Sequence, residues 1–221
     1  MHASRIVALA AACCCCWPNL AQGNDADWPA YLGGKKRDLY STLEQINGGN
    51  VSQLEVAWTY ETGDAAEYQA NNLIVEGVLY TATPSRKVIA LSADTGEELW
   101  KWDPANEHTG PGRPRQRGLV YWENENGGER RLFSATKGFL FAVDPKTGET
   151  IRGFGENGSI NLNSGLNTPG VTWKDVLIVG GVGGQGSVRA FDVRTGKQRW
   201  IFDLIPRPGE VGHDTWPEDA R

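Results

Sequence analysis

The chain has 221 residues and a formal net charge of −5, from 27 acidic and 22 basic side chains. An acidic chain is not attracted to nucleic-acid phosphates, so the composition argues against a nucleic-acid partner and favours a small or neutral one. Because 39% of the residues are hydrophobic, the chain is able to bury a sizeable core.

The N-terminus predicts an export signal over residues 1–23. A basic start at Arg5 precedes a short apolar run over residues 6–17. All four cysteines, Cys13–Cys16, lie in this run, so we expect a periplasmic mature chain without thiols or disulfides. Two alternatives stay open. One is acylation at Cys13, although the preceding alanines match that signal poorly, and the other is an uncleaved anchor, although the run is short for a span.

Residues 24–49 are polar and rich in turns, which predicts an N-terminal arm lying over the structure that follows. Residues 50–60 then predict a strand that ends near Trp58, as the outer strand of a first blade. Further strand-like runs lie at residues 73–80, 88–92, 119–122, 131–135, 139–143, 176–179 and 188–192. Residues 206–221 are irregular, and we expect them to be a loop in a chain that stops in mid-course.

Three segments share one pattern, an apolar strand followed by an Asp/Thr/Gly turn and a new strand. Their alanines, Ala90, Ala142 and Ala190, are 52 and 48 residues apart. Glycine permits the positive φ of the turn, and the new strand reaches Trp100 in the first copy and Trp200 in the third. A flat indole ring is able to dock between neighbouring blades and donate its N–H to a backbone carbonyl.

The middle copy has no tryptophan at this position, and Phe154 is the nearest aromatic residue. The period is typical of four-stranded blades in a radial array. The prediction is therefore an all-β chain, with residues 50–221 forming about four blades of a β-propeller as an incomplete ring.

The segment Gly181–Gly186 matches the G-x-G-x-x-G pattern of dinucleotide-binding sites. Such a site needs a helix directly after the glycines, so that the helix N-terminus faces the pyrophosphate. A strand-like run over residues 188–192 follows instead, so we interpret the glycines as a loop on the ligand-facing rim.

Neither a metal cluster nor a hydrolytic triad is evident. His108 and His213 are far apart in sequence, and no nucleophile elbow is present. The alternating arginines Arg113, Arg115 and Arg117 precede a strand and offer a local anion site, since a guanidinium holds a carboxylate in a bidentate pair. On composition alone, the alternative of a solvated turn is favoured.

The repeat closing in tryptophan resembles the tryptophan-docking motif of the eight-bladed quinoprotein dehydrogenases, which use pyrroloquinoline quinone (PQQ). Other segments resemble the same family, in the same order: Asp27–Tyr31, Leu43–Asn47, Val56–Tyr60, Gly77–Tyr80, Arg117–Trp122 and Gly212–Pro217. Together they cover essentially the whole mature chain, and the membrane-type glucose dehydrogenases are the most similar branch.

The resemblance implies oxidation of a sugar or alcohol C–OH by PQQ, with Ca²⁺ or another divalent cation, and electron transfer to a membrane quinone or a cytochrome. It places Arg117 on a PQQ carboxylate. Gln69 and Thr168 correspond to polar contacts near the cofactor, and Gln185 is the one side chain in its glycine loop able to replace an acidic or amide metal ligand.

Some positions depart from the family pattern. Ser85 replaces a histidine found in some glucose enzymes, which leaves the sugar preference open. The catalytic aspartate and the tryptophan that supports the PQQ ring belong to later blades of the family, so no catalytic residue is assigned.

We therefore expect the N-terminal part of a periplasmic PQQ-dependent dehydrogenase, inactive alone. One alternative is a non-catalytic propeller that scaffolds protein assembly. Another is a self-associating half-propeller in which two copies supply eight blades, because unpaired strand edges favour pairing.

Overall fold

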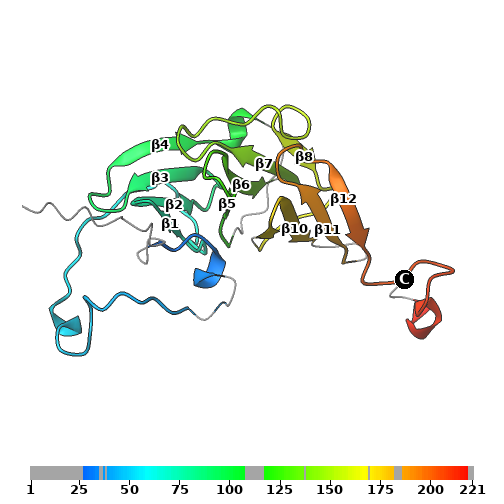
Figure 1. Cartoon of the computed structure of the whole chain (residues 1–221), viewed down its shortest axis with the longest axis horizontal. Helices are drawn as coiled ribbons and strands as arrows, with labels where there is room; N and C mark the ends of the chain where they lie inside the picture. The colour runs from blue at the N-terminus through cyan, green and yellow to red at the C-terminus, as the bar shows by residue number, and fades with distance from the viewer. Residues whose placement is uncertain are drawn as a thin grey trace, which may run out of the picture.

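The structure is a computed structural model that describes residues 27–34, 37, 39–107, 117–136, 138–168, 170–181 and 186–218. The expected export signal over residues 1–23 lies outside this range. The described part holds three four-stranded antiparallel sheets, which lie side by side in an arc (Figure 1). It forms part of a β-propeller.

Each sheet is a meander in which consecutive strands pair. The first sheet contains β1 (Leu73–Val75), β2 (Val78–Ala82), β3 (Val88–Ser92) and β4 (Glu98–Trp102). The second contains β5 (Val120–Glu123), β6 (Arg130–Thr136), β7 (Phe139–Val143) and β8 (Ser159–Asn161). The third contains β9 (Val171–Trp173), β10 (Val176–Gly180), β11 (Val188–Asp192) and β12 (Gln198–Phe202).

Among the described residues, four short 3₁₀ helices lie outside the sheets, at η1 (Tyr31–Gly33), η2 (Val51–Gln53), η3 (Pro104–Asn106) and η4 (His213–Thr215). No described helix is long and apolar enough to cross a membrane. In the N-terminal arm, Trp28 forms two backbone hydrogen bonds with Ile74 of β1.

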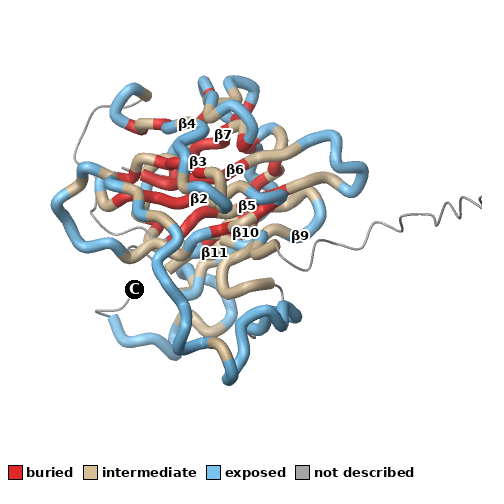
Figure 2. The backbone as a smooth tube through the Cα atoms, turned by 90° about the vertical axis from the view of Figure 1, so that its left-hand side faces the viewer, coloured by how far each residue is buried: buried red, intermediate tan, exposed pale blue. Residues whose placement is uncertain are grey.

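The second sheet is buried on both faces, and the side chains of its strands point alternately to one neighbouring sheet and to the other. Leu132 of β6 packs in a cluster with the first sheet, whereas the next residue, Phe133, packs in a cluster with the third sheet. Side chains of a strand point alternately to opposite faces, so one strand contributes to both cores. Figure 2 shows these buried segments running through the middle of the stacked sheets.

Two strand predictions need revision. The run over residues 73–80 is two strands, because Glu76 and Gly77 both adopt positive φ and form the β1–β2 turn. Residues 54–60 belong to no strand, since no described neighbour offers them a ladder of hydrogen bonds. The described residues thus complete three sheets, where the sequence predicted about four.

The predicted tryptophan dock is confirmed for Trp100 of the first repeat. Trp100 donates its indole N–H to the carbonyl of Pro145, at 3.0 Å, and its ring lies over Gly148 of the second repeat. A Cβ on Gly148 would come within 2.6 Å of that ring, and the φ of this glycine is +75°. Glycine is therefore required for both the turn and the close approach.

Candidate functional site

The segments that lead into β1, β5 and β9, the first strands of the three sheets, meet at one end of these strands and are called the strand entrances. Asn71 donates its backbone N–H and its side-chain amide to the carbonyl of Arg117, both at 3.1 Å. Arg117 in turn donates its backbone N–H to the carbonyl of Asn167, at 3.0 Å. Because Gln69 lies two residues before Asn71 and Thr168 directly follows Asn167, three of the four predicted site residues share this end.

The side chains at this end are accessible to a ligand. Arg117 and Thr168 are exposed, and Gln69 is half-buried. The adjacent Gly118 pairs with Asn71 in a parallel bridge, which fixes the backbone that carries Arg117. An exposed guanidinium on a fixed backbone suits a carboxylate ligand, because its planar fork of donors matches two carboxylate oxygens.

Asn167 has a buried polar atom beneath this surface. Its Oδ1 is buried and has no hydrogen-bond partner among the described residues. Asn167 and Thr168 line a small cavity whose other walls are mostly apolar side chains of the second and third sheets, and its volume is about 10 Å³. That volume is at the lower limit for one water molecule, so any larger ligand at this end would lie on the surface.

The glycine loop reaches the same end of the third sheet. Gln185 lies outside the described residues, so its predicted role is not tested. At the edges of the loop, Gly181 donates its backbone N–H to the carbonyl of Ser187, at 2.9 Å. β11 then begins at Val188, where a dinucleotide site would need a helix, so the predicted strand after the glycines is confirmed.

Arg189 lies beside this glycine loop, and the sequence did not indicate it as a residue of the site. Arg189 donates to the carbonyl of Leu162 and to the Oγ of Ser164. Burial lowers the pKa of its guanidinium. The pattern of alternating residues in β11 could have placed Arg189 on one face of the strand, but only the structure brings it to Ser164.

Asp64 and Arg86 were also missed, and both organise the loop between β2 and β3. Asp64 accepts the backbone N–H of Ser85, at 2.8 Å. Burial tends to raise the pKa of this carboxyl, but hydrogen bonds from Thr83 and Ser85 outweigh it and hold the pKa below its ordinary value. The buried Arg86 donates to the carbonyl of Ala135, at 2.8 Å, and so ties this loop to the second sheet.

The described residues contain no group of three or more His, Cys, Asp or Glu side chains able to hold a metal ion. A divalent cation of the Ca²⁺ type takes six to eight oxygen ligands. The described part of the site therefore does not fit a complete cation site.

A family model described as "PQQ: Glucose/ethanol/alcohol dehydrogenase, beta-propeller domain" matches residues 28–221. The chain belongs to this family. It is 35% identical to the dehydrogenase subunit of alcohol dehydrogenase (quinone) from Gluconobacter oxydans, over 84% of this chain and 26% of the relative. It is 31% identical to quinoprotein glucose dehydrogenase A from Acinetobacter calcoaceticus, over 81% of this chain and 28% of the relative.

The solved structures agree with this membership. The quinohemoprotein alcohol dehydrogenase ADHIIG from Pseudomonas putida HK5 superposes with a TM-score of 0.71 and 27% identity, over 86% of this chain and 29% of that chain. The chain thus spans about a quarter to a third of the length of these relatives.

The residues at the strand entrances fit part of the PQQ cofactor. PQQ is a flat quinone that carries carboxylates, and Arg117 offers the donors that a carboxylate needs. The adjoining cavity is too small to enclose such a ligand, so the described surface offers contacts on one side only.

Proposed function

We propose that this chain forms part of a PQQ-dependent dehydrogenase that oxidises a sugar or an alcohol, and that this part holds one edge of the cofactor. The relatives' names support the substrate class, and the exposed Arg117 at the joined strand entrances supports the role in binding. When bound, PQQ supplies the quinone that accepts the electrons of the C–OH group.

The chain's own residues have binding roles in this proposal. Arg117 pairs with a carboxylate of the cofactor, and its backbone position is held by the hydrogen bonds from Asn71 and to Asn167. Gln69 and Thr168 add polar contacts on either side, and Gln185 is the candidate for a contact to the cation, Ca²⁺ or another divalent ion. The oxidation itself requires groups beyond those described, so no catalytic residue is assigned.

We also propose that the chain is exported to the periplasm and passes electrons to a membrane quinone or a cytochrome. The basic start and apolar run within residues 1–23 support export. The names of an alcohol dehydrogenase (quinone) and of a methanol dehydrogenase [cytochrome c] among the relatives support the two types of acceptor. N-terminal sequencing of the chain recovered from the periplasm tests the export step, and an intact residue 1 would contradict cleavage.

Quenching of tryptophan fluorescence tests the binding role. The whole chain is titrated with PQQ and Ca²⁺, and we expect saturable quenching. Arg117→Ala should weaken binding about tenfold or more, because a bidentate, charge-assisted pair is lost. Arg117→Lys should recover part of the affinity, since lysine keeps the charge but not the fork.

Arg152→Ala is the matched control, because Arg152 is exposed and pairs with Glu107 away from the strand entrances. It should bind PQQ like the unaltered chain. Equal binding by all the variants would show that Arg117 does not hold the cofactor. No binding by the unaltered chain would contradict a cofactor surface on this part alone, as expected if the site needs further blades or if the chain is a scaffold without a cofactor.

A further inference from the structure

Arg189 occupies a position that is apolar in the other two repeats. The residue directly before the repeat alanine is Ile89 in the first sheet, Phe141 in the second and Arg189 in the third. Ile89 is 0% exposed and Phe141 is 1% exposed, and the Phe141 ring packs on Trp102 of the preceding sheet, with 5.1 Å between the ring centroids. The repeat thus places a buried apolar side chain here twice and an arginine once.

Packing alone does not require this arginine. Burying a guanidinium costs free energy that an apolar side chain would not cost. Arg189 is half-buried, and its Nε is enclosed without a hydrogen-bond partner among the described residues. A sequence that departs from its own pattern at such a cost indicates a role beyond folding.

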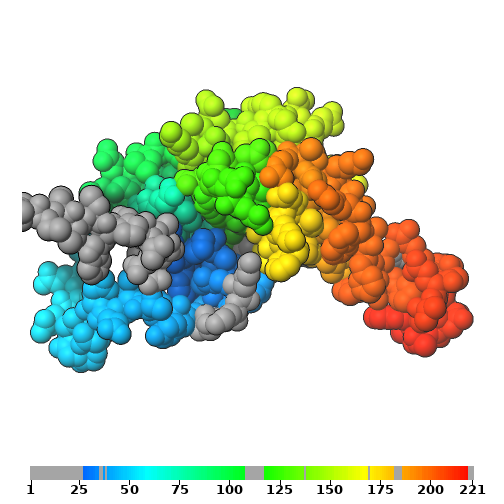
Figure 3. Space-filling model, in the orientation of Figure 1, coloured from blue at the N-terminus to red at the C-terminus, as the bar shows by residue number. Residues whose placement is uncertain are grey.

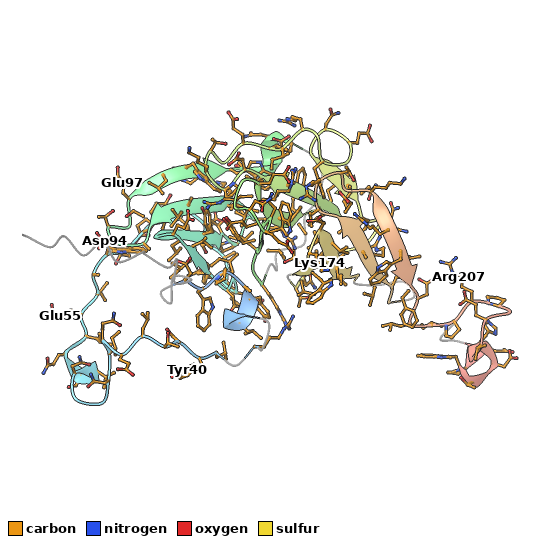
Figure 4. The ribbon with its side chains drawn as sticks, viewed as in Figure 1. Tyr40, Glu55, Asp94, Glu97, Lys174 and Arg207 are labelled. Carbon is orange, nitrogen blue, oxygen red and sulfur yellow. The ribbon has the colours of Figure 1, made fainter. Side chains whose placement is uncertain are left out.

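The guanidinium of Arg189 joins the third sheet to the segment that follows β8 of the second. It donates through Nη1 to the carbonyl of Leu162 and through Nη2 to the Oγ of Ser164, the latter at 2.5 Å. Figure 3 shows the third sheet, in yellow and orange, directly beside the green second sheet. This joint lies between the ends of the arc, which Asp94 and Arg207 mark in Figure 4, so its contacts do not depend on what covers those ends.

The segment held by Arg189 carries part of the proposed cofactor surface. Three residues after Ser164, the carbonyl of Asn167 accepts the backbone N–H of Arg117, at 3.0 Å. The exposed Thr168 comes next in the chain. A shift of this segment would therefore move both Thr168 and the acceptor that holds the Arg117 backbone.

The same guanidinium also lies against the start of the glycine loop. A Cβ on Gly181 would come within 3.0 Å of the Oγ of Ser164 and 3.3 Å of Nη2 of Arg189. Glycine permits this close approach because it has no side chain. The N–H of Gly181 is held in addition by the carbonyl of Ser187, at 2.9 Å. One side chain thus contacts two separate segments at the strand entrances.

We propose that Arg189 is a positioning residue, whose guanidinium holds residues 162–168 and Gly181 in the arrangement that a ligand of Arg117 and Thr168 meets. This inference rests on the proposed function, because the ligand is the cofactor proposed above. The positioning itself is measurable without a cofactor, so the two proposals fail in different experiments.

Amide hydrogen exchange of the unaltered chain and of Arg189→Met tests the positioning. Methionine is unbranched, flexible and uncharged, so it suits a position that is apolar in the other repeats. The amides of Arg117 and Gly181 should exchange at least about tenfold faster in the variant, because the segments that hold them open more readily. The amide of Gly148, which donates to Asp144 in the turn of the second repeat, should exchange at an unchanged rate.

Tryptophan quenching by PQQ with Ca²⁺ tests the consequence for binding. Arg189→Met should weaken binding about five- to tenfold, while the midpoint of thermal unfolding stays the same or rises, because replacing a buried charge by an apolar side chain is often neutral or stabilising. A role in folding alone would instead lower the midpoint and leave the affinity unchanged.

Two further variants identify the contact that matters. Arg189→Lys should recover part of the affinity, since lysine keeps the charge but not the fork that reaches both acceptors. Ser164→Ala should weaken binding in the unaltered chain but add nothing in the Arg189→Met chain, where its hydrogen bond is already lost. Should Arg189→Met fail to fold, Ser164→Ala is measured through the same two amides.

Arg199→Met is the matched control, because Arg199 of the neighbouring β12 pairs with Asp192 at the other end of β11. It should change neither the two amides nor the affinity for PQQ. Unchanged exchange in Arg189→Met overturns the inference whether or not PQQ binds, and so does faster exchange with unchanged affinity. Faster exchange in a chain that does not bind PQQ supports the positioning and contradicts the proposed function of this part.

Discussion

The two joints between the three sheets are built differently. Between the first and second sheets, Trp100 and Tyr80 both donate to the carbonyl of Pro145, and the Trp100 ring covers Gly148. Between the second and third sheets, the corresponding glycine is Gly196, and its near neighbours are the side chain of Ile160 and the backbone of Gly155.

The second joint compensates for the missing tryptophan with backbone contact and core aromatics. Gly155 donates its N–H to the carbonyl of Thr195, at 2.9 Å. Phe154 does not occupy the dock; it is fully buried, with its ring 5.5 Å from that of Phe133. Trp122 donates to the carbonyl of Lys174, at 2.8 Å. One architecture thus tolerates an indole dock or a close backbone approach at equivalent places.

The largest effect should come from breaking the backbone joint. Gly155 has a φ of +58°, and a Cβ there would overlap the carbonyl of Ser159. Since a backbone neighbour cannot rotate away, Gly155→Ala should lower the free energy of unfolding by about 3 kcal/mol or more. Denaturant unfolding measures the loss. Gly153→Ala is the control, because a Cβ at Gly153 has nothing within 4 Å, and an equal loss there would contradict this explanation.

Breaking the indole joint should cost somewhat less. Trp100→Ala removes a half-buried ring and its hydrogen bond to Pro145, which should lower the free energy of unfolding by about 2–4 kcal/mol. Trp100→Phe should recover most of the loss, because it keeps apolar contact with Gly148. If both variants unfolded like the unaltered chain, Trp100 would not hold the sheets together.

The smallest effect concerns the turn of the third repeat and depends on pH. Burial tends to raise the pKa of Asp192, but hydrogen bonds from Arg199, Thr195 and Arg194 outweigh it and lower the pKa from 3.8 to about 2. The ionised form is therefore favoured by folding. Its stabilising contribution is present above pH 3.8 and is lost as the pH falls toward about 2.

Asp192→Asn should make the stability of the fold less dependent on pH in this acidic range. Thermal unfolding of the two chains between pH 5 and pH 2 measures the difference, which should amount to a few degrees in Tm at the upper end and vanish at the lower end. A difference that is constant with pH would mean that the charge of Asp192 is not the cause.

The sequence by itself determined the repeat and therefore the sheets, because a strand, an Asp/Thr/Gly turn and the next strand interact over a few residues. It also pointed to the tryptophan dock and placed Arg117 just before a strand. Short β8 and β9 were missed, since three residues carry little periodic signal.

Only the tertiary structure decided which distant segments meet. Asn71, Arg117 and Asn167 are about 50 residues apart along the chain, and nothing local indicates that their backbones are hydrogen bonded. Likewise, the run ending in Trp58 has the residues of a strand, yet it forms none, because a strand requires a partner as well as a propensity.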